Sequence, residues 1–182
     1  MAAALSAPLN ADAERGYGGP EAMAETVRQF VMAGVAGMNV EDSNPQALGS
    51  PMTLVPLDLH LAKIRAITEA RRALGSEFFL NARVDVLGTV RDYKDGMDET
   101  IRRGNAYAEA GGDCIFIFRP PDAEGIRTLV REIKAPLCLS LELSAHKVQR
   151  ARQVFDHPPM GVQRLLQGRH PLALMLPLHT HQ

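Results

Sequence analysis

The sequence predicts an α/β fold in which strands and helices alternate along the chain. Short apolar segments alternate with amphipathic helical segments at intervals of roughly thirty residues. Three successive strand segments also carry polar side chains at every second position near their carboxyl ends. This repeat matches a (β/α)8 barrel of about 250 residues, whose centre brings the carboxyl ends of its strands together. We therefore predict an incomplete barrel of the TIM-barrel type with about five clear strand–helix units; an open doubly wound sheet is the alternative.

The strands and helices follow in order from the amino terminus. The first strand is short, and Asn10 and Asp12 lie near its end. The later strands and helices end at glycine or proline or where the hydrophobic periodicity stops. The spacing predicts strands over 37–42, 77–87, 114–118 and 136–143, and helices over 20–33, 57–74, 97–110 and 122–133. In the helix over 57–74, Leu57, Leu61 and Ile64 form the apolar side, and we expect Lys63 on the exposed side.

The sequence changes character after residue 143. We expect a partial barrel domain over 1–143 and an atypical region over 144–182, in which a helix over 144–155 precedes a tail. Four of the six histidines lie between 157 and 181, but no histidine pair has metal-ligand spacing on a clear helix, which favours a tail without a metal site. Cys114 and Cys138 lie in apolar runs, and we interpret both as core residues without a disulfide.

Composition limits the class of protein. The 182 residues are 46% hydrophobic and carry a net charge of −1, which is typical of a soluble domain with a sizeable core. No basic run indicates nucleic-acid binding, and no apolar stretch is long enough to cross a membrane. The amino terminus lacks the charged and apolar regions of a signal peptide, so we expect a cytoplasmic protein.

Acidic residues mark the end of the first strand. Asp12 and Glu14 alternate with small residues, so their carboxylates share one face of an extended segment. Paired carboxylates at a strand end suit Mg²⁺, which prefers oxygen ligands; a solvated acidic loop is the alternative. Phosphate binding by the glycines at 16–19 is disfavoured, because the run lacks the usual spacing and lysine.

The next two strands repeat this pattern. Asn39 and Glu41 share a face near the end of the second strand, and Asn81, Arg83 and Asp85 do so in the third. In a barrel these side chains converge. A structural ion pair of Arg83 with Asp85 or Glu41 is an alternative to a substrate-binding role.

Four blocks of the sequence resemble the isocitrate lyase/phosphoenolpyruvate mutase superfamily in order and spacing. The blocks are residues 10–18 (NADAERGYG), 33–43 (AGVAGMNVEDS), 81–85 (NARVD) and 103–116 (RGNAYAEAGGDCIF). The resemblance covers residues 8–137 and implies an α/β barrel that binds Mg²⁺, or Mn²⁺ in its place, together with a 2-oxo acid or its enolate. It also implies cleavage or formation of a C–C or P–C bond, and homo-oligomers are expected by analogy.

The resemblance assigns roles to individual residues. Asp12 and Glu14 stand at the positions of metal-binding acids, and Glu41 matches the acid that reaches the metal's water shell. Arg83 matches the arginine that touches substrate, where its guanidinium would stabilise an enolate oxygen. We expect Asn39 and Asn81 to bind substrate beside it.

The sequence also departs from this superfamily. The loop after Glu41 reads SNPQALGSP, without the catalytic cysteine of isocitrate lyases or the gating-loop lysine of phosphonate-forming members. Only eleven residues precede Asp12, and the tail does not resemble the superfamily's last strand. Two hypotheses follow: a Mg²⁺-dependent lyase-like enzyme acting on a small 2-oxo acid through an enolate, and a non-catalytic truncated relative or gene fragment.

Overall fold

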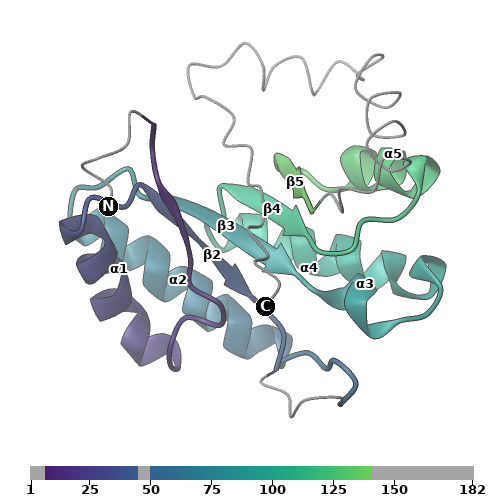
Figure 1. Cartoon of the computed structure of the whole chain (residues 1–182), viewed down its shortest axis with the longest axis horizontal. Helices are drawn as coiled ribbons and strands as arrows, with labels where there is room; N and C mark the ends of the chain where they lie inside the picture. Colours follow the sequence, from purple (N-terminus) through teal and green to yellow (C-terminus); the bar gives the residue numbers. More distant parts are fainter. Residues whose placement is uncertain (1–6, 45–49, 141–182) are drawn as a thin grey trace, which may run out of the picture.

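A five-stranded parallel sheet forms the centre of the structure (Figure 1). The structure is a computed structural model, and it describes residues 7–44 and 50–140. The strands are β1 (Asn10–Asp12), β2 (Gly37–Glu41), β3 (Phe79–Val84), β4 (Cys114–Ile117) and β5 (Leu137–Leu139). Each strand pairs in parallel with the next one along the chain.

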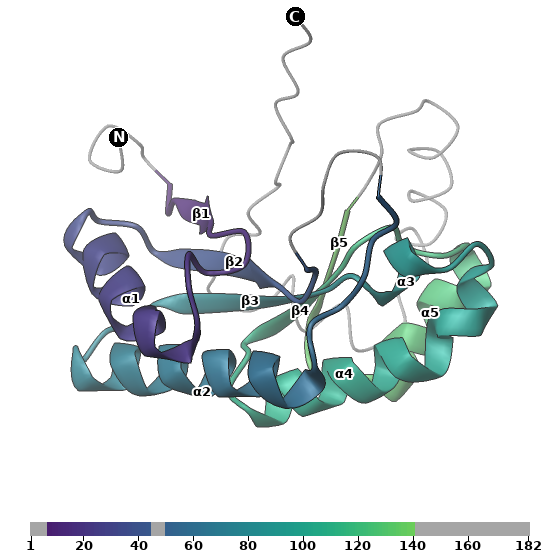
Figure 2. The same cartoon turned by 90° about the horizontal axis from the view of Figure 1, so that it is seen from below.

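Helices connect consecutive strands. The α-helices are α1 (Met23–Met32), α2 (Leu57–Ala73), α3 (Val86–Thr89), α4 (Met97–Glu109) and α5 (Ala123–Glu132). Two 3₁₀ turns, η2 (Pro20–Ala22) and η3 (Tyr93–Gly96), precede α1 and α4. Figure 2 shows the long helices together on one side of the sheet. Among the described residues, no helix has the length and apolarity needed to cross a membrane.

The strand order confirms the predicted fold class. The order β1-β2-β3-β4-β5 is sequential, whereas a doubly wound sheet reverses its strand order at a switch point and carries helices on both faces. A sheet with sequential parallel strands and helices on one face has the arrangement of consecutive units in a (β/α)8 barrel.

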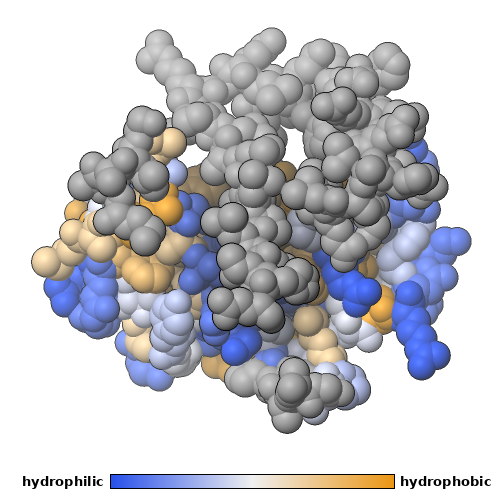
Figure 3. All heavy atoms as spheres, in the orientation of Figure 1, coloured by the Kyte–Doolittle hydropathy of each residue, from blue (hydrophilic) through white to orange (hydrophobic). Residues whose placement is uncertain are grey.

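The hydrophobic core lies between the sheet and the helices. Alternate side chains of the central strands point into it and are completely buried: Met38, Val40, Leu80, Ala82, Val84, Ile115 and Ile117. Helix residues such as Val27, Ile64 and Leu129 cover them. In Figure 3, hydrophilic side chains lie at the outer edges of the molecule, over α1 and around α3. Because side chains alternate along a strand, the other half of the strand side chains lies on the face of the sheet opposite the helices, and many of these are polar.

Several element boundaries differ from the prediction. The third strand ends at Val84, because Val86–Thr89 forms the short helix α3, which sequence periodicity did not predict. The fifth strand is shorter than predicted, although residues 141–143 lie outside the described residues. The helix expected over 144–155 and the histidine-rich tail also lie outside them.

Lys63 was wrongly expected on the exposed side of its helix. Its side chain is buried, and its Nζ donates a hydrogen bond of 2.7 Å to the main-chain oxygen of Arg15. Desolvation lowers the pKa of Lys63. Helix α2 thus contributes a buried cation beneath the loop that follows β1.

A buried ionic cluster joins the carboxyl ends of β2 and β3 to α4. Asp42 Oδ1 accepts a 2.8 Å hydrogen bond from the main-chain N–H of Asp85, while its Oδ2 accepts from Tyr107 at 2.6 Å and from Arg103 at 3.0 Å. Arg103 also donates to the main-chain oxygen of Val55 at 3.2 Å. Burial raises the pKa of Asp42, and these hydrogen bonds oppose that rise. We call Asp42, Arg103 and Tyr107 the Asp42 clamp.

We expect the Asp42 clamp to dominate the stability of this end of the sheet. Replacing Arg103 by Met leaves the Asp42 carboxylate buried without its counter-charge, which should cost about 3–5 kcal/mol of unfolding free energy. Tyr107→Phe removes two hydrogen bonds, one donated to Asp42 and one accepted from Arg103, and should cost about 1–3 kcal/mol. Urea unfolding measures both, with the exposed neighbour Arg102→Met as the matched control, which should change stability by less than about 0.5 kcal/mol. A larger loss for Tyr107→Phe than for Arg103→Met would contradict this assignment.

His60 should make the fold sensitive to mild acid. Its ring is fully buried 4.7 Å from that of Tyr107, and neither ring nitrogen has a hydrogen-bond partner among the described residues. Desolvation, helped by the charges of Lys63 and Arg103, lowers the pKa of His60 from 6.5 to about 3. Between these values the unfolded chain binds a proton that the folded protein does not, so His60 reduces stability as the pH falls from 6.5 towards 3.

Removing this imidazole should flatten the pH dependence of stability. Between about pH 7.5 and about pH 5 the wild type should lose about 2 kcal/mol more than His60→Leu, whose side chain does not titrate. Urea unfolding of both proteins at both pH values gives this difference, in which the contributions of the shared acidic groups cancel. Equal losses in the two proteins would show that His60 takes up its proton over the same pH range in the folded protein as in the unfolded chain.

Candidate functional site

The polar side chains of the first three strands lie on the face of the sheet opposite the helices. The pairing register places Asp12 beside Asn39, Asn39 beside Asn81, and Glu41 beside Arg83. Because side chains alternate along a strand, these residues point away from the core that Met38 and Val40 enter. The strand register therefore places polar side chains of β1, β2 and β3 on one face of the sheet, and the convergence of Asp12 with Glu41 and Arg83 stays a prediction.

A row of amides crosses the middle of this face. Asn39 Oδ1 accepts hydrogen bonds from Asn10 Nδ2 at 2.8 Å and from Asn81 Nδ2 at 3.1 Å. The Oδ1 atom of Asn81 is buried and has no hydrogen-bond partner among the described residues. Asn39 and Asn81 thus lie beside the charged residues, as expected, and their substrate-binding role stays a prediction.

A row of five charges alternates in sign across the carboxyl ends of the same strands. Arg15 pairs with Glu14 at 3.5 Å and with Glu41 at 3.1 Å, while Arg83 pairs with Glu41 at 2.9 Å and with Asp85 at 2.7 Å. We call this set the charge row. It links residues from three successive strand ends into one electrostatic unit.

The turn after β1 positions the first part of the charge row. Glu14 and Tyr17 have positive φ angles of 46° and 61°, and Gly16 has a φ angle of 94°. The Asp12 carboxylate accepts the main-chain N–H of Glu14 at 2.9 Å, and the Gly16 N–H donates to the main-chain oxygen of Ala13 at 2.7 Å. The Gly16 amide is therefore used within the turn, which argues against the phosphate cradle considered from the sequence.

Arg83 lies between acidic and aromatic groups. Its Nε donates to Asp85 Oδ1 at 2.9 Å, and its guanidinium carbon lies 4.3 Å from the ring centre of Phe118 and 5.6 Å from that of Phe116. Such contacts with aromatic faces stabilise a guanidinium. Arg83 thus forms both ion pairs that were considered as the alternative to a substrate-binding role, with Glu41 and with Asp85, and its substrate-binding role stays a prediction.

Asp85 is the fully buried acid of the charge row. Burial raises its pKa to about 7, while the Arg83 guanidinium opposes that rise and the charges of Asp42 and Glu41 add to it. Its Oδ2 atom is buried without a hydrogen-bond partner in the described part of the chain. Asp85 thus has an unused acceptor next to Arg83.

Sequence reasoning missed two parts of this site. Arg15 was not selected, although it adjoins Glu14 and is the only basic residue in the block over 10–18. Asp42 was not selected either, although an acid that directly follows Glu41 points to the opposite face and needs a buried partner. Charge compensation for the selected acids would have drawn attention to both residues.

The metal-ligand assignment stays a prediction. In the ranges 7–44 and 50–140, no group of three histidine, cysteine or acidic side chains is close enough to hold a metal ion. The Asp12 carboxylate contacts its own turn, whereas Glu14 and Glu41 share the Arg15 guanidinium. Carboxylate oxygens are the ligands that a hard divalent cation prefers, and two of the three acids, Glu14 and Glu41, lie beside one shared guanidinium.

The cysteines are not part of this arrangement. Cys114 is buried, Cys138 is half-buried, and both are free thiols. Desolvation raises the pKa of each thiol, which disfavours the reactive thiolate.

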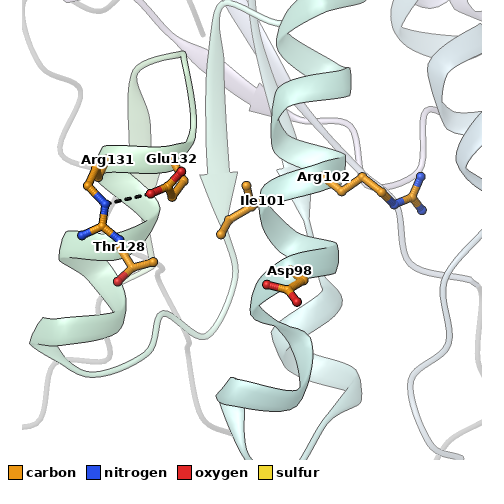
Figure 4. A pocket seen from close by; sticks show the side chains of 6 residues that line it. All are labelled: Asp98, Ile101, Arg102, Thr128, Arg131 and Glu132. Carbon is orange, nitrogen blue, oxygen red and sulfur yellow. Dashed lines mark hydrogen bonds and ion pairs between the residues drawn. The ribbon is translucent and has the colours of Figure 1, made fainter.

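A separate groove of about 430 Å³ lies between α4 and α5 (Figure 4). Its lining residues are Asp98, Ile101, Arg102, Thr128, Arg131 and Glu132. In Figure 4, Ile101 points toward α5 and Arg102 points away from it. None of the residues predicted from the sequence lines this groove, so it is separate from the charge row.

Comparisons with known proteins agree with the fold. Carboxyvinyl-carboxyphosphonate phosphorylmutase of Arabidopsis thaliana is 36% identical over 137 residues, which cover 73% of this chain and 39% of that protein. Oxaloacetate decarboxylase of Pseudomonas putida (strain GB-1) is 32% identical over 134 residues, covering 72% and 44%. The chain thus spans about two fifths of the length of these curated relatives.

A solved structure gives the same result. The crystal structure of 2,3-dimethylmalate lyase, a member of the PEP mutase/isocitrate lyase superfamily, has 34% sequence identity and a TM-score of 0.62. The match covers 76% of this chain and 46% of that one. A family model described as phosphoenolpyruvate phosphomutase matches residues 1–181. Since this match covers nearly the whole sequence, the chain belongs to the phosphoenolpyruvate phosphomutase family of the PEP mutase/isocitrate lyase superfamily.

Proposed function

We propose that this chain carries the metal- and substrate-binding part of a lyase-type site that acts on a small 2-oxo acid through an enolate. The charge row supports this proposal most directly, because it places acids and a guanidinium from three neighbouring strand ends in contact. The relatives described above include a phosphorylmutase, a decarboxylase and a lyase by name. The bond that is broken, C–C or P–C, therefore stays open in the proposal.

Asp12, Glu14 and Glu41 would hold Mg²⁺, or Mn²⁺ in its place. Their oxygen atoms are the ligands that these ions prefer. When bound, the ion would withdraw electrons from the carboxylate and keto oxygen of a 2-oxo acid. Of the three proposed metal ligands, Glu41 is the one that contacts the proposed substrate-binding residue Arg83.

Arg83 would stabilise the negative charge that develops on the enolate oxygen. Its side chain is only 16% exposed and is fixed by Glu41, Asp85 and the Phe118 ring, so its orientation is set before substrate binds. A pre-oriented cation at a partly desolvated position stabilises a developing charge more strongly than a mobile one in water. Asn81 would contact the substrate next to it through its amide N–H, because the oxygen atoms of a 2-oxo acid accept hydrogen bonds.

Binding of a stable enolate mimic tests the metal part of this proposal. The full-length chain should bind oxalate only when Mg²⁺ is present, and Asp12→Asn should abolish that binding because it removes a carboxylate charge from the metal group. Isothermal titration calorimetry measures the binding. Asp98→Asn, which removes an exposed carboxylate on α4, is the matched control and should bind as the wild type does.

Two results would refute the metal part. One is the absence of any Mg²⁺-dependent oxalate binding by a cooperatively folded wild type, which would favour the non-catalytic relative instead. The other is oxalate binding of equal strength in the wild type and Asp12→Asn.

Replacing Arg83 should separate substrate binding from metal binding. Arg83→Gln removes a charged donor, so oxalate affinity should fall by about tenfold to a hundredfold, whereas Mg²⁺ affinity should not decrease because Glu41 loses a competing cation. Titrations of Mg²⁺ alone and of oxalate in saturating Mg²⁺ distinguish these effects. Arg102→Gln, which replaces an exposed side chain of α4, is the control. Unchanged oxalate affinity in Arg83→Gln would leave Arg83 with a structural role only.

A further inference from the structure

Arg15 lies between two of the acids assigned to the metal. Its Nη1 is 3.1 Å from Glu41 Oε1, and its Nη2 is 3.5 Å from Glu14 Oε2. The guanidinium therefore supplies the positive charge that these carboxylates share in the structure. About a third of the Arg15 side chain is exposed, so it has a path to solvent.

The main chain around Arg15 is fixed independently of its side chain. Lys63 Nζ donates to the main-chain oxygen of Arg15 at 2.7 Å, and the main-chain N–H of Glu41 donates to the main-chain oxygen of Glu14 at 2.8 Å. These bonds hold the turn against the end of β2. The Arg15 side chain can therefore move while Glu14 and Glu41 stay adjacent.

Both oxygen atoms of Glu41 already contact a guanidinium group. Oε1 accepts from Arg15 and, at 2.7 Å, from the hydroxyl of Ser43, while Oε2 contacts Arg83 at 2.9 Å. A divalent cation that binds Glu41 must compete with these donors. Arg83 is held further by the buried Asp85, whereas the other partner of Arg15 is Glu14, which is 61% exposed. Arg15 is therefore the cation that leaves more easily.

We propose that Arg15 is the resident counter-ion of the metal acids, and that a divalent cation binds Glu14 and Glu41 only as the Arg15 guanidinium moves out toward solvent. This inference rests on the metal site of the proposed function and adds a residue that sets its affinity. Arg15 neutralises the adjacent carboxylates in the absence of metal, and it lowers the affinity for the ion that replaces it. It acts as a positioning residue, since it contacts the metal acids and not the reacting atoms.

Titration of Mg²⁺ alone into full-length variants tests this competition. Arg15→Gln should bind Mg²⁺ about tenfold more tightly than the wild type, because a divalent cation no longer displaces or faces a positive charge a few ångströms away. Arg15→Lys keeps the charge and should stay close to the wild type. Arg127→Gln removes an exposed arginine from α5, at the other end of the sheet, and should leave the affinity unchanged.

Arginine side-chain ¹⁵N NMR of the wild type provides a second measurement that needs no variant. The Nε–H signal of Arg15 should shift during the Mg²⁺ titration, while that of Arg127 should not. Equal or weaker Mg²⁺ binding by Arg15→Gln, or an Arg15 signal that does not respond to saturating Mg²⁺, would overturn the inference and leave the proposed function intact. If neither protein binds Mg²⁺, both the inference and the metal part of the proposed function are wrong.

Discussion

The Asp42 carboxylate is the interaction on which the site depends. It follows Glu41 directly and points to the helix side of the sheet, where Arg103 and Tyr107 of α4 hold it. Its other oxygen takes the main-chain N–H of Asp85, the residue that ends the run from Asn81 to Asp85. One buried acid thus fixes the ends of β2 and β3 relative to each other. Because a buried charge needs its partners, the geometry is enforced by a large energetic penalty.

The charge row is built outward from this fixed point. Glu41 and Arg83 are neighbours in register, so their ion pair follows from the strand pairing itself. Arg15 reaches Glu41 from the turn after β1, which Lys63 fixes from below. Residues of the helices therefore hold the strand ends and the turn in place, whereas the polar face carries side chains with unpartnered oxygen atoms, such as Asn81 and Asp85.

Much of this arrangement was predictable from the sequence, because strand periodicity alone places Asn39, Glu41, Asn81 and Arg83 on one face. The alternation of strand and helix left a doubly wound sheet open, and the polar residues at successive strand ends favoured the sequential barrel order that the structure has. Periodicity could not predict that Lys63 is buried, because its burial depends on a main-chain oxygen supplied by a loop 48 residues away. Likewise, the partnership of Asp42 with Arg103 spans 61 residues, and such long-range compensation leaves no local pattern.

The balance of charge at this site favours the binding of a divalent cation. The charge row holds three carboxylates and the guanidinium groups of Arg15 and Arg83, and Asp12 adds a fourth carboxylate in the turn after β1, so this set carries a net charge of −2 when all are ionised. The deficit of two positive charges equals the charge of one divalent cation. Such an ion would neutralise the site, and any displacement of Arg15 would then leave an unpaired guanidinium beside it. An anionic acid could approach that arrangement, whereas the carboxylates alone would repel it.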